Sequence, residues 1–172
     1  MDSARKRLRA RINKRSLLVA PGIYDAYGAR FVEAAGFEAV YMTGNGVSAS
    51  LLGRPDVGLV DLTLFAQHAH RAAACVDIPL ICDADTGYGN AVNVRHTVRE
   101  FEAAGVAAIH IEDQLAPKRC GHLPGARPVI ELGEAVGRCP QRLGVIWSSI
   151  WIAATPAASN SRTVCRTLTA LP

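Results

Sequence analysis

The chain has 172 residues, of which 49% are hydrophobic and 20% are charged. This composition supports a buried core of single-domain size and excludes an intrinsically disordered chain, which would carry fewer apolar side chains. The five cysteines are odd in number and form no Cys-x-x-Cys pair, so they indicate neither a disulfide framework nor a zinc cluster. We therefore expect a soluble, reduced, cytoplasmic protein.

The formal net charge of +4 raises the possibility of a nucleic-acid partner. Much of the positive charge lies in residues 5–15, but no aromatic side chain is interleaved with these bases, and the pattern also fits a solvated helix face. The apolar run 17–20 is shorter than the roughly 7–15 residues of a secretory signal, although a mitochondrial presequence stays compatible with the basic start. The run 143–154 is shorter than the roughly 17–25 residues of a membrane-spanning helix. We predict no nucleic-acid partner and no membrane partner.

Apolar runs alternate with helix-like stretches over the first 111 residues. Four runs have the length of buried strands: residues 17–20, 39–42, 79–82 and 107–111. Three stretches have the spacing or position of helices: residues 25–35, 61–74 and 92–104, the last closed by Gly105. Repeated strand–helix units with almost uninterrupted apolar strands predict an α/β fold whose parallel sheet is covered on both faces.

The segment from Gly44 to Ala49 follows a predicted strand and matches the Gly-x-Gly-x-x-Ala pattern of dinucleotide sites. In such sites the glycines open a helix at once, whereas Gly53 and Pro55 interrupt the sequence here. We therefore interpret the segment as a tight glycine-rich loop, whose amides could hold a carboxylate as well as a phosphate.

The composition changes near residue 138. All fifteen acidic residues precede Cys139, and residues 139–172 contain both tryptophans but no Asp, Glu or Lys. We predict a domain over residues 1–138 and a divergent tail over residues 139–172, either poorly ordered or produced by a change of reading frame.

Acidic side chains follow two neighbouring predicted strands. Asp83 and Asp85 stand two residues apart, so an extended backbone would place both carboxylates on one face, and Glu112 ends the next strand. Such a sparse carboxylate set fits Mg²⁺, with Mn²⁺ as an alternative, better than a calcium cage. A solvated acidic turn with helix caps is the competing interpretation, and Glu112 at the neighbouring strand end weighs against it.

Cys120 lies in the polar segment Lys118-Arg119-Cys120-Gly121-His122. Two cations before it and a histidine after it favour the thiolate, so this side chain could move a proton near neutral pH. A lone cysteine is more often an inert core residue, but a polar loop lacks the apolar surroundings of a core. We predict that Cys120 is catalytic and that the other four cysteines are core or incidental residues.

Six motifs together resemble the isocitrate lyase and phosphoenolpyruvate mutase superfamily, and within it the 2-methylisocitrate lyase-like enzymes. The likeness runs from about Ser16 to Gly137 and is carried by residues 21–26, 41–46, 53–56, 83–89, 111–114 and 118–122. It implies a (β/α)8 barrel, usually oligomeric, that uses Mg²⁺ to bind a hydroxy or keto carboxylate and to stabilise an enolate.

The resemblance also implies roles for individual residues. Asp83, Asp85 and Glu112 would hold the metal, and Tyr41 or a neighbour would take the proton of the substrate hydroxyl. Cys120 would protonate the departing carbanion, with Lys118, Arg119 and His122 tuning its thiol. The substrate contacts that the resemblance implies are Thr43, Gly44, Asn45, Asp83, Arg119, Cys120 and Gly121.

Phosphonomutase and hydrolase members of the superfamily that this sequence resembles generally lack Lys-Arg-Cys-Gly-His, so the resemblance implies carbon–carbon cleavage rather than phosphonate chemistry. We therefore expect a Mg²⁺-dependent lyase of the methylisocitrate lyase type, acting on a small 2-hydroxy or 2-keto di- or tricarboxylate. Thr43 in place of serine and Asn45 in place of glycine depart from the methylisocitrate lyase pattern. Relatives acting on dimethylmalate, oxaloacetate or carboxyphosphonoenolpyruvate therefore stay open, as does a non-catalytic protein that binds Mg²⁺ and dicarboxylates.

Recognisable barrel sequence covers roughly four strands, whereas a complete (β/α)8 barrel takes about 250 residues. We therefore expect about four strand–helix units, the first half of a barrel, followed by the atypical tail. A half-barrel leaves strand edges open, so we expect this chain to self-associate if it folds and to be poorly active alone.

Overall fold

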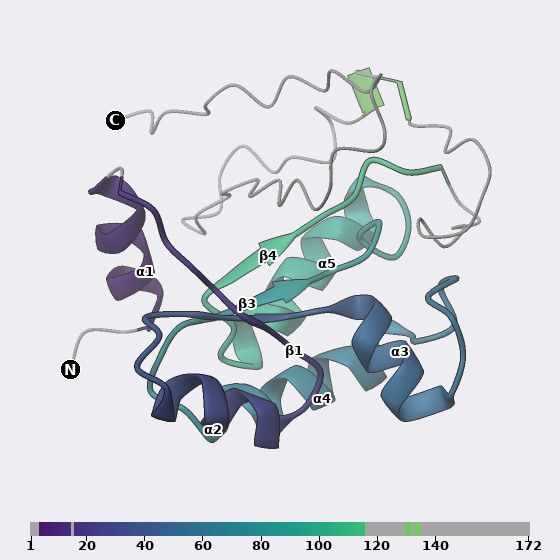
Figure 1. Ribbon diagram of the computed structural model, residues 1–172. Coiled ribbons are helices and arrows are strands. Elements are labelled where there is room, and N and C mark those ends of the chain that lie inside the picture. Colours follow the sequence, from purple (N-terminus) through teal and green to yellow (C-terminus); the bar gives the residue numbers. More distant parts are fainter. Residues whose placement is uncertain (1–3, 15, 116–129, 132, 135–172) are drawn as a thin grey trace, which may run out of the picture.

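The computed structural model describes residues 4–14, 16–115, 130–131 and 133–134. Within these residues helices alternate with short parallel strands (Figure 1). In chain order the elements are α1 (Ala4–Asn13), β1 (Gly22–Ile23), α2 (Ala26–Ala34), β2 (Val40–Met42), α3 (Gly44–Leu52), α4 (Leu62–Ala74), β3 (Leu80–Asp83), α5 (Ala91–Ala103) and β4 (Ala108–His110).

The four strands form one parallel sheet in the order β1-β2-β3-β4. The register pairs Met42 of β2 with Cys82 of β3, and Asp83 of β3 with His110 of β4. Because every strand runs in the same direction, the residues that follow the strands meet at one edge of the sheet.

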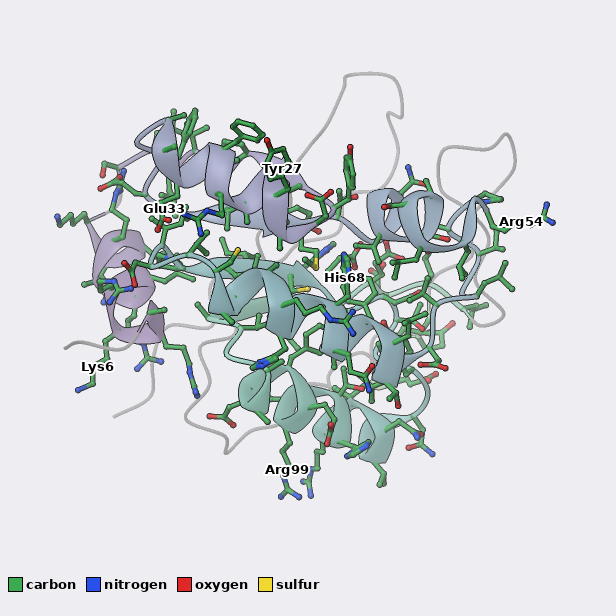
Figure 2. The ribbon with its side chains drawn as sticks, turned by 90° about the horizontal axis from the view of Figure 1, so that it is seen from below. Lys6, Tyr27, Glu33, Arg54, His68 and Arg99 are labelled. Carbon is green, nitrogen blue, oxygen red and sulfur yellow. The ribbon has the colours of Figure 1, made fainter. Side chains whose placement is uncertain are left out.

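Three helices cover one face of this sheet: α2, α4 and α5 lie side by side in one layer, and α4 contacts both of the others (Figure 2). Phe65 of α4 and Phe101 of α5 pack together with ring centroids 5.8 Å apart, inside the main apolar cluster. A second cluster forms around Leu8 of α1, which packs with Ala39 and Ala108 near the starts of β2 and β4. α1 and α3 lie near opposite ends of the sheet (Figure 1).

Polar residues fix where the helices begin. The side-chain oxygens of Asp25, Thr43, Asp61 and Asn90 accept hydrogen bonds from backbone N–H groups in the first turns of α2, α3, α4 and α5. Each cap satisfies a donor that has no partner within its own helix. Gly105, with φ of +88°, follows the end of α5, as its position in the sequence predicts.

Two predictions about elements are wrong. The apolar run 17–20 is not a strand: β1 is Gly22–Ile23, and the Leu17 side chain is 83% exposed. The segment from Gly44 to Ala49 is not a loop either, because Thr43 caps α3 and Gly44 is its first residue.

The basic face of α1 is only partly solvated. Arg5 pairs with Glu102, Arg7 donates to the Asp77 carbonyl, and Arg11 forms a salt bridge with Glu38 at 2.6 Å. These contacts attach α1 to the sheet and its helices, so part of the charge that raised the possibility of nucleic-acid binding has a structural role. None of the helices among the described residues combines the length and the hydropathy that a membrane span requires.

Candidate active site

Asp83, the last residue of β3, is held by two backbone N–H groups. Its Oδ2 accepts from Gly44 N at 3.2 Å and its Oδ1 accepts from Asp85 N at 2.9 Å, and the residue is 8% exposed. The Gly44 amide belongs to the first turn of α3, where the helix dipole favours negative charge. The carboxylate of Asp83 is therefore fixed in position and electrostatically stabilised.

The turn after β3 is not the extended backbone that the sequence predicted. Asp85 has φ of +53° and Tyr88 has φ of +60°, so both adopt the left-handed conformation that non-glycine residues rarely take. The alternation argument for Asp83 and Asp85 therefore fails, because it requires an extended chain. The two residues are close for another reason: the Asp85 amide bonds the Asp83 side chain.

Glu112 joins this turn from the end of β4. Its N–H donates to the Asp85 carbonyl at 2.8 Å, and its Oε2 accepts from Gln114 Nε2 at 2.5 Å. The buried Gln114 thus orients the carboxylate of Glu112. Among the described residues, however, no three His, Cys, Asp or Glu side chains are already grouped to hold one metal ion. Joint metal binding by Asp83, Asp85 and Glu112 stays a prediction.

Asp56 is an acidic residue for which no role was predicted from the sequence. A Cβ added to Gly44 would lie 2.7 Å from Asp83 Oδ2 and 3.3 Å from Asp56 Oδ2, so both carboxylates approach the start of α3. Buried Ser48 holds the loop that carries Asp56, because its hydroxyl hydrogen-bonds to the carbonyls of Arg54 and Pro55. The motif Gly53-Arg54-Pro55-Asp56 was the only sequence signal for this residue.

The side chain of Tyr41 lies among the same carboxylates. Its hydroxyl is 3.4 Å from Nδ1 of His110, a second residue for which no role was predicted from the sequence. Burial, and then the charge of Asp83, raises the pKa of Tyr41 well above its usual value, with Glu112 and Asp56 adding to the effect. Tyr41 is therefore protonated at neutral pH in this structure and can donate a hydrogen bond.

The start of α3 also changes the interpretation of the Gly44-Asn45-Gly46 segment. The helix opens at once, so the argument used above against a dinucleotide site is wrong. One amide of this turn is not available to a phosphate, because Gly44 N already donates to Asp83 Oδ2. The Asn45 side chain is exposed and makes no hydrogen bond to another described residue.

The donor set at this edge of the sheet fits a hard divalent cation. Asp56, Asp83, Asp85 and Glu112 supply only carboxylate oxygens, the ligand type that Mg²⁺ and Mn²⁺ prefer. The charges of Asp83 and Asp56 raise the pKa of both Tyr41 and Tyr88, which agrees with the approach of these two carboxylates to Gly44. A cation there would offset like charges that otherwise repel each other.

The family of this chain follows from its similarity to known proteins. The family described as phosphoenolpyruvate phosphomutase matches residues 8–141. The chain belongs to the PEP mutase/isocitrate lyase superfamily. It is 49% identical over 138 residues to a 2,3-dimethylmalate lyase of Eubacterium barkeri, covering 80% of this chain and 47% of that protein. It is 43% identical over 150 residues to a 2-methylisocitrate lyase of Aeropyrum pernix, covering 87% of this chain and 48% of that protein.

Solved structures of superfamily members share the fold. A crystal structure of 2,3-dimethylmalate lyase matches with a TM-score of 0.74 and 43% identity over 80% of this chain and 46% of that chain. A phosphonopyruvate hydrolase in complex with oxalate and Mg²⁺ matches with a TM-score of 0.71 and 33% identity, again over 80% of this chain and 46% of that chain. The predicted α/β fold is confirmed: the four parallel strands and their helices match part of the superfamily barrel. The chain spans about half the length of the curated relatives it matches.

Several predicted features of this superfamily member lie outside the described residues. They include the tail 139–172 and the polar segment that carries Lys118, Arg119, Cys120, Gly121 and His122. Of the other cysteines, Cys82 is fully buried and burial raises its pKa well above the usual value, which agrees with the predicted core role. Cys75 is half-buried, and its thiol lies 3.3 Å from the Ala26 carbonyl.

Proposed function

We propose that this protein binds a divalent cation, Mg²⁺ or Mn²⁺, together with a small 2-hydroxy or 2-keto di- or tricarboxylate, and that it cleaves a carbon–carbon bond of that acid, although only poorly when the half-barrel is alone. The observation that carries the proposal is the position of Asp83, fixed between the start of α3 and the Asp85 turn and close to Asp56. The relatives named 2,3-dimethylmalate lyase and 2-methylisocitrate lyase support the reaction class. The hydrolase structure that contains oxalate and Mg²⁺ supports the ligand class.

Asp83, Asp85 and Glu112 are the residues that would hold the cation, with Asp56 beside them. The bound cation would supply the positive charge that stabilises an enolate as the carbon–carbon bond breaks. Asp83 has a second task, because its two hydrogen bonds connect the Asp85 turn to α3. It thereby sets the distance between the cation ligands and the substrate-binding end of that helix.

The first turn of α3 would bind a carboxylate of the substrate. Thr43 caps the helix through Gly46 N, and Gly44 N is engaged with Asp83, so the amide of Asn45 remains for a ligand. A helix start favours negative charge, and the exposed Asn45 side chain can add a further donor. Thr43 and Gly44 then position this donor set, and Asn45 contacts the substrate.

Proton transfer would divide between Tyr41 and Cys120. The raised pKa of Tyr41 keeps its phenol protonated, so Tyr41 first donates a hydrogen bond to the substrate hydroxyl. To act as the base, Tyr41 must first release its own proton, which requires positive charge that offsets the nearby carboxylates. Cys120, as its neutral thiol, would give its proton to the carbanion product and become a thiolate, whose charge Lys118, Arg119 and His122 would stabilise, while Gly121 would give the segment close access to the substrate.

Calorimetry tests the binding step. Mg²⁺ is titrated into the protein, and oxalate, a mimic of the enolate, is then titrated with Mg²⁺ present. We expect D85N to weaken oxalate binding at least about 10-fold, because one charged ligand of the cation is lost. The matched control is E100Q on α5, whose carboxylate is exposed and 3.7 Å from His96 Nδ1. Oxalate binding that does not depend on Mg²⁺, or that D85N leaves unchanged, would contradict the proposal.

Turnover is tested separately with 2-methylisocitrate, 2,3-dimethylmalate and oxaloacetate as substrates. Relatives named oxaloacetate decarboxylase and carboxyvinyl-carboxyphosphonate phosphorylmutase match this chain at 43% and 44% identity, so the choice of acid has to be measured. Binding with turnover supports the proposed lyase activity, and the acid that is cleaved most efficiently identifies the substrate. Binding without turnover supports the non-catalytic alternative. Self-association and the absence of a nucleic-acid partner stay predictions.

A further inference from the structure

Tyr88, in the turn between β3 and α5, has a buried hydroxyl without a hydrogen-bond partner among the described residues. Almost all buried polar groups in folded proteins have a partner, so this orphaned donor requires an explanation. The ring itself packs against the main apolar cluster beneath the turn. The hydroxyl is buried together with this ring.

The turn holds Tyr88 at a conformational cost. The residue has φ of +60°, a backbone conformation that is unfavourable for a bulky side chain. The buried hydroxyl of Thr97 on α5 donates to the Gly87 carbonyl at 3.0 Å, which fixes the turn one residue before Tyr88. Strain of this kind concentrates at ligand-binding sites, where the surrounding contacts maintain it.

The surroundings of the hydroxyl are anionic. Burial and then the charge of Asp85 raise the pKa of Tyr88 above its usual value, and the charges of Asp83 and Asp56 add to the effect. The phenol is therefore an O–H donor at neutral pH. Although it is close enough to these carboxylates to respond to their charge, it bonds none of them, which leaves its proton for an oxygen that is bound among them.

We propose that Tyr88 is a ligand-binding residue whose hydroxyl donates a hydrogen bond to a carboxylate oxygen of the acid that binds with the cation beside Asp83 and Asp85. This inference rests on the proposed function and adds a specific contact to it. An acid in the site would supply the acceptor that the described residues do not provide. The competing explanation is a structural water that satisfies the hydroxyl whether or not an acid is bound.

The variant Tyr88→Phe separates the two explanations, because it removes one oxygen and keeps the ring. If the acid is the acceptor, the ligand-free variant loses no hydrogen bond, so its urea midpoint equals or exceeds that of the parent protein. Its dissociation constant for oxalate, measured by calorimetry with saturating Mg²⁺, rises about 10-fold, as expected for one hydrogen bond to a charged acceptor.

The matched control is Tyr27→Phe, which removes a hydroxyl from a ring that is 71% exposed on α2 and projects away from the helix layer (Figure 2). It should change neither the urea midpoint nor oxalate binding. If Tyr88→Phe lowers the ligand-free midpoint and leaves oxalate binding unchanged, the water explanation holds and the inference is wrong. If Tyr88→Phe and the parent protein bind oxalate equally well, only the inference about Tyr88 is wrong. If the parent protein does not bind oxalate at all, the proposed function is wrong as well.

Discussion

Replacing Gly44 by alanine should damage the site through one added methyl group. The new Cβ would lie 2.7 Å from Asp83 Oδ2 and 3.2 Å from Asp83 Cγ, with Asp56 Oδ2 at 3.3 Å on another side. Ordinary contacts between such atoms begin at about 3.4 Å, so Asp83 has to move by more than half an ångström. It cannot do so freely, because both of its oxygens accept backbone hydrogen bonds.

The cost follows from the bond that breaks. Moving Asp83 away from α3 removes the hydrogen bond from Gly44 N, and a bond to a charged acceptor contributes about 1.5–3 kcal/mol. We expect G44A to lower the free energy of unfolding by about that amount and to weaken oxalate binding in the presence of Mg²⁺ at least 10-fold. Urea denaturation and calorimetry measure the two effects.

Gly22 supplies the control, because a Cβ added there meets no atom within 4 Å and its backbone is not left-handed. G22A should leave oxalate binding unchanged and alter the free energy of unfolding by less than about 0.5 kcal/mol. The reasoning is refuted if G44A binds oxalate like the parent protein and unfolds at the same urea concentration.

Two further predictions concern stability. Because the pKa values of Tyr41 and Tyr88 are raised above the usual 10.0, the folded protein keeps protons that the unfolded chain releases, and stability should fall as pH rises above about 10. Each tyrosine contributes up to about 1.4 kcal/mol to this loss of stability per pH unit. Urea denaturation should therefore show that the free energy of unfolding of Y41F falls less steeply with alkaline pH than that of the parent protein. Equal slopes in the two proteins would exclude Tyr41 as a cause. Leu8 is 1% exposed and packs against Ala39 and Ala108, so L8A should lower the free energy of unfolding by about 2–5 kcal/mol. Thermal or urea unfolding measures this loss, and a loss under about 1 kcal/mol would show that α1 contributes little to stability.

Much of the fold could be predicted because its signals are local and repeated. The apolar runs 39–42, 79–82 and 107–111 correspond to β2, β3 and β4, and the helix predicted over 61–74 corresponds to α4. Such runs are apolar because both faces of a parallel strand become buried. The first strand was missed because β1 has only two residues and contains Gly22, whereas the more apolar run before it stays outside the sheet.

α3 could not be predicted from local preference. Its first turn contains Gly44 and Gly46, and glycine is a poor helix former. The helix begins there because Thr43 caps it, and its buried residues Val47 and Ser48 attach it to the core and to the loop before α4. Tertiary contacts therefore override the propensity of the segment.

The candidate site was partly visible in the sequence. Asp83, Asp85 and Glu112 were recognisable because they follow consecutive predicted strands, and parallel strands bring such residues to one edge. The left-handed turn at Asp85 could not be recognised from the sequence, because no residue type there requires it. Asp56 was missed because it lies 27 positions before Asp83, and only the folded chain brings both carboxylates to Gly44.

The central claim is that the carboxylates of Asp83, Asp85 and Glu112 hold one divalent cation beside the start of α3. Crystals grown with Mn²⁺ and oxalate test it directly, because anomalous scattering locates manganese without assumptions about its ligands. We predict one strong peak at the carboxyl ends of β3 and β4, bound to these residues directly or through a water molecule, with oxalate next to Asn45. A crystal that binds Mn²⁺ elsewhere, or oxalate away from this edge of the sheet, would contradict the account.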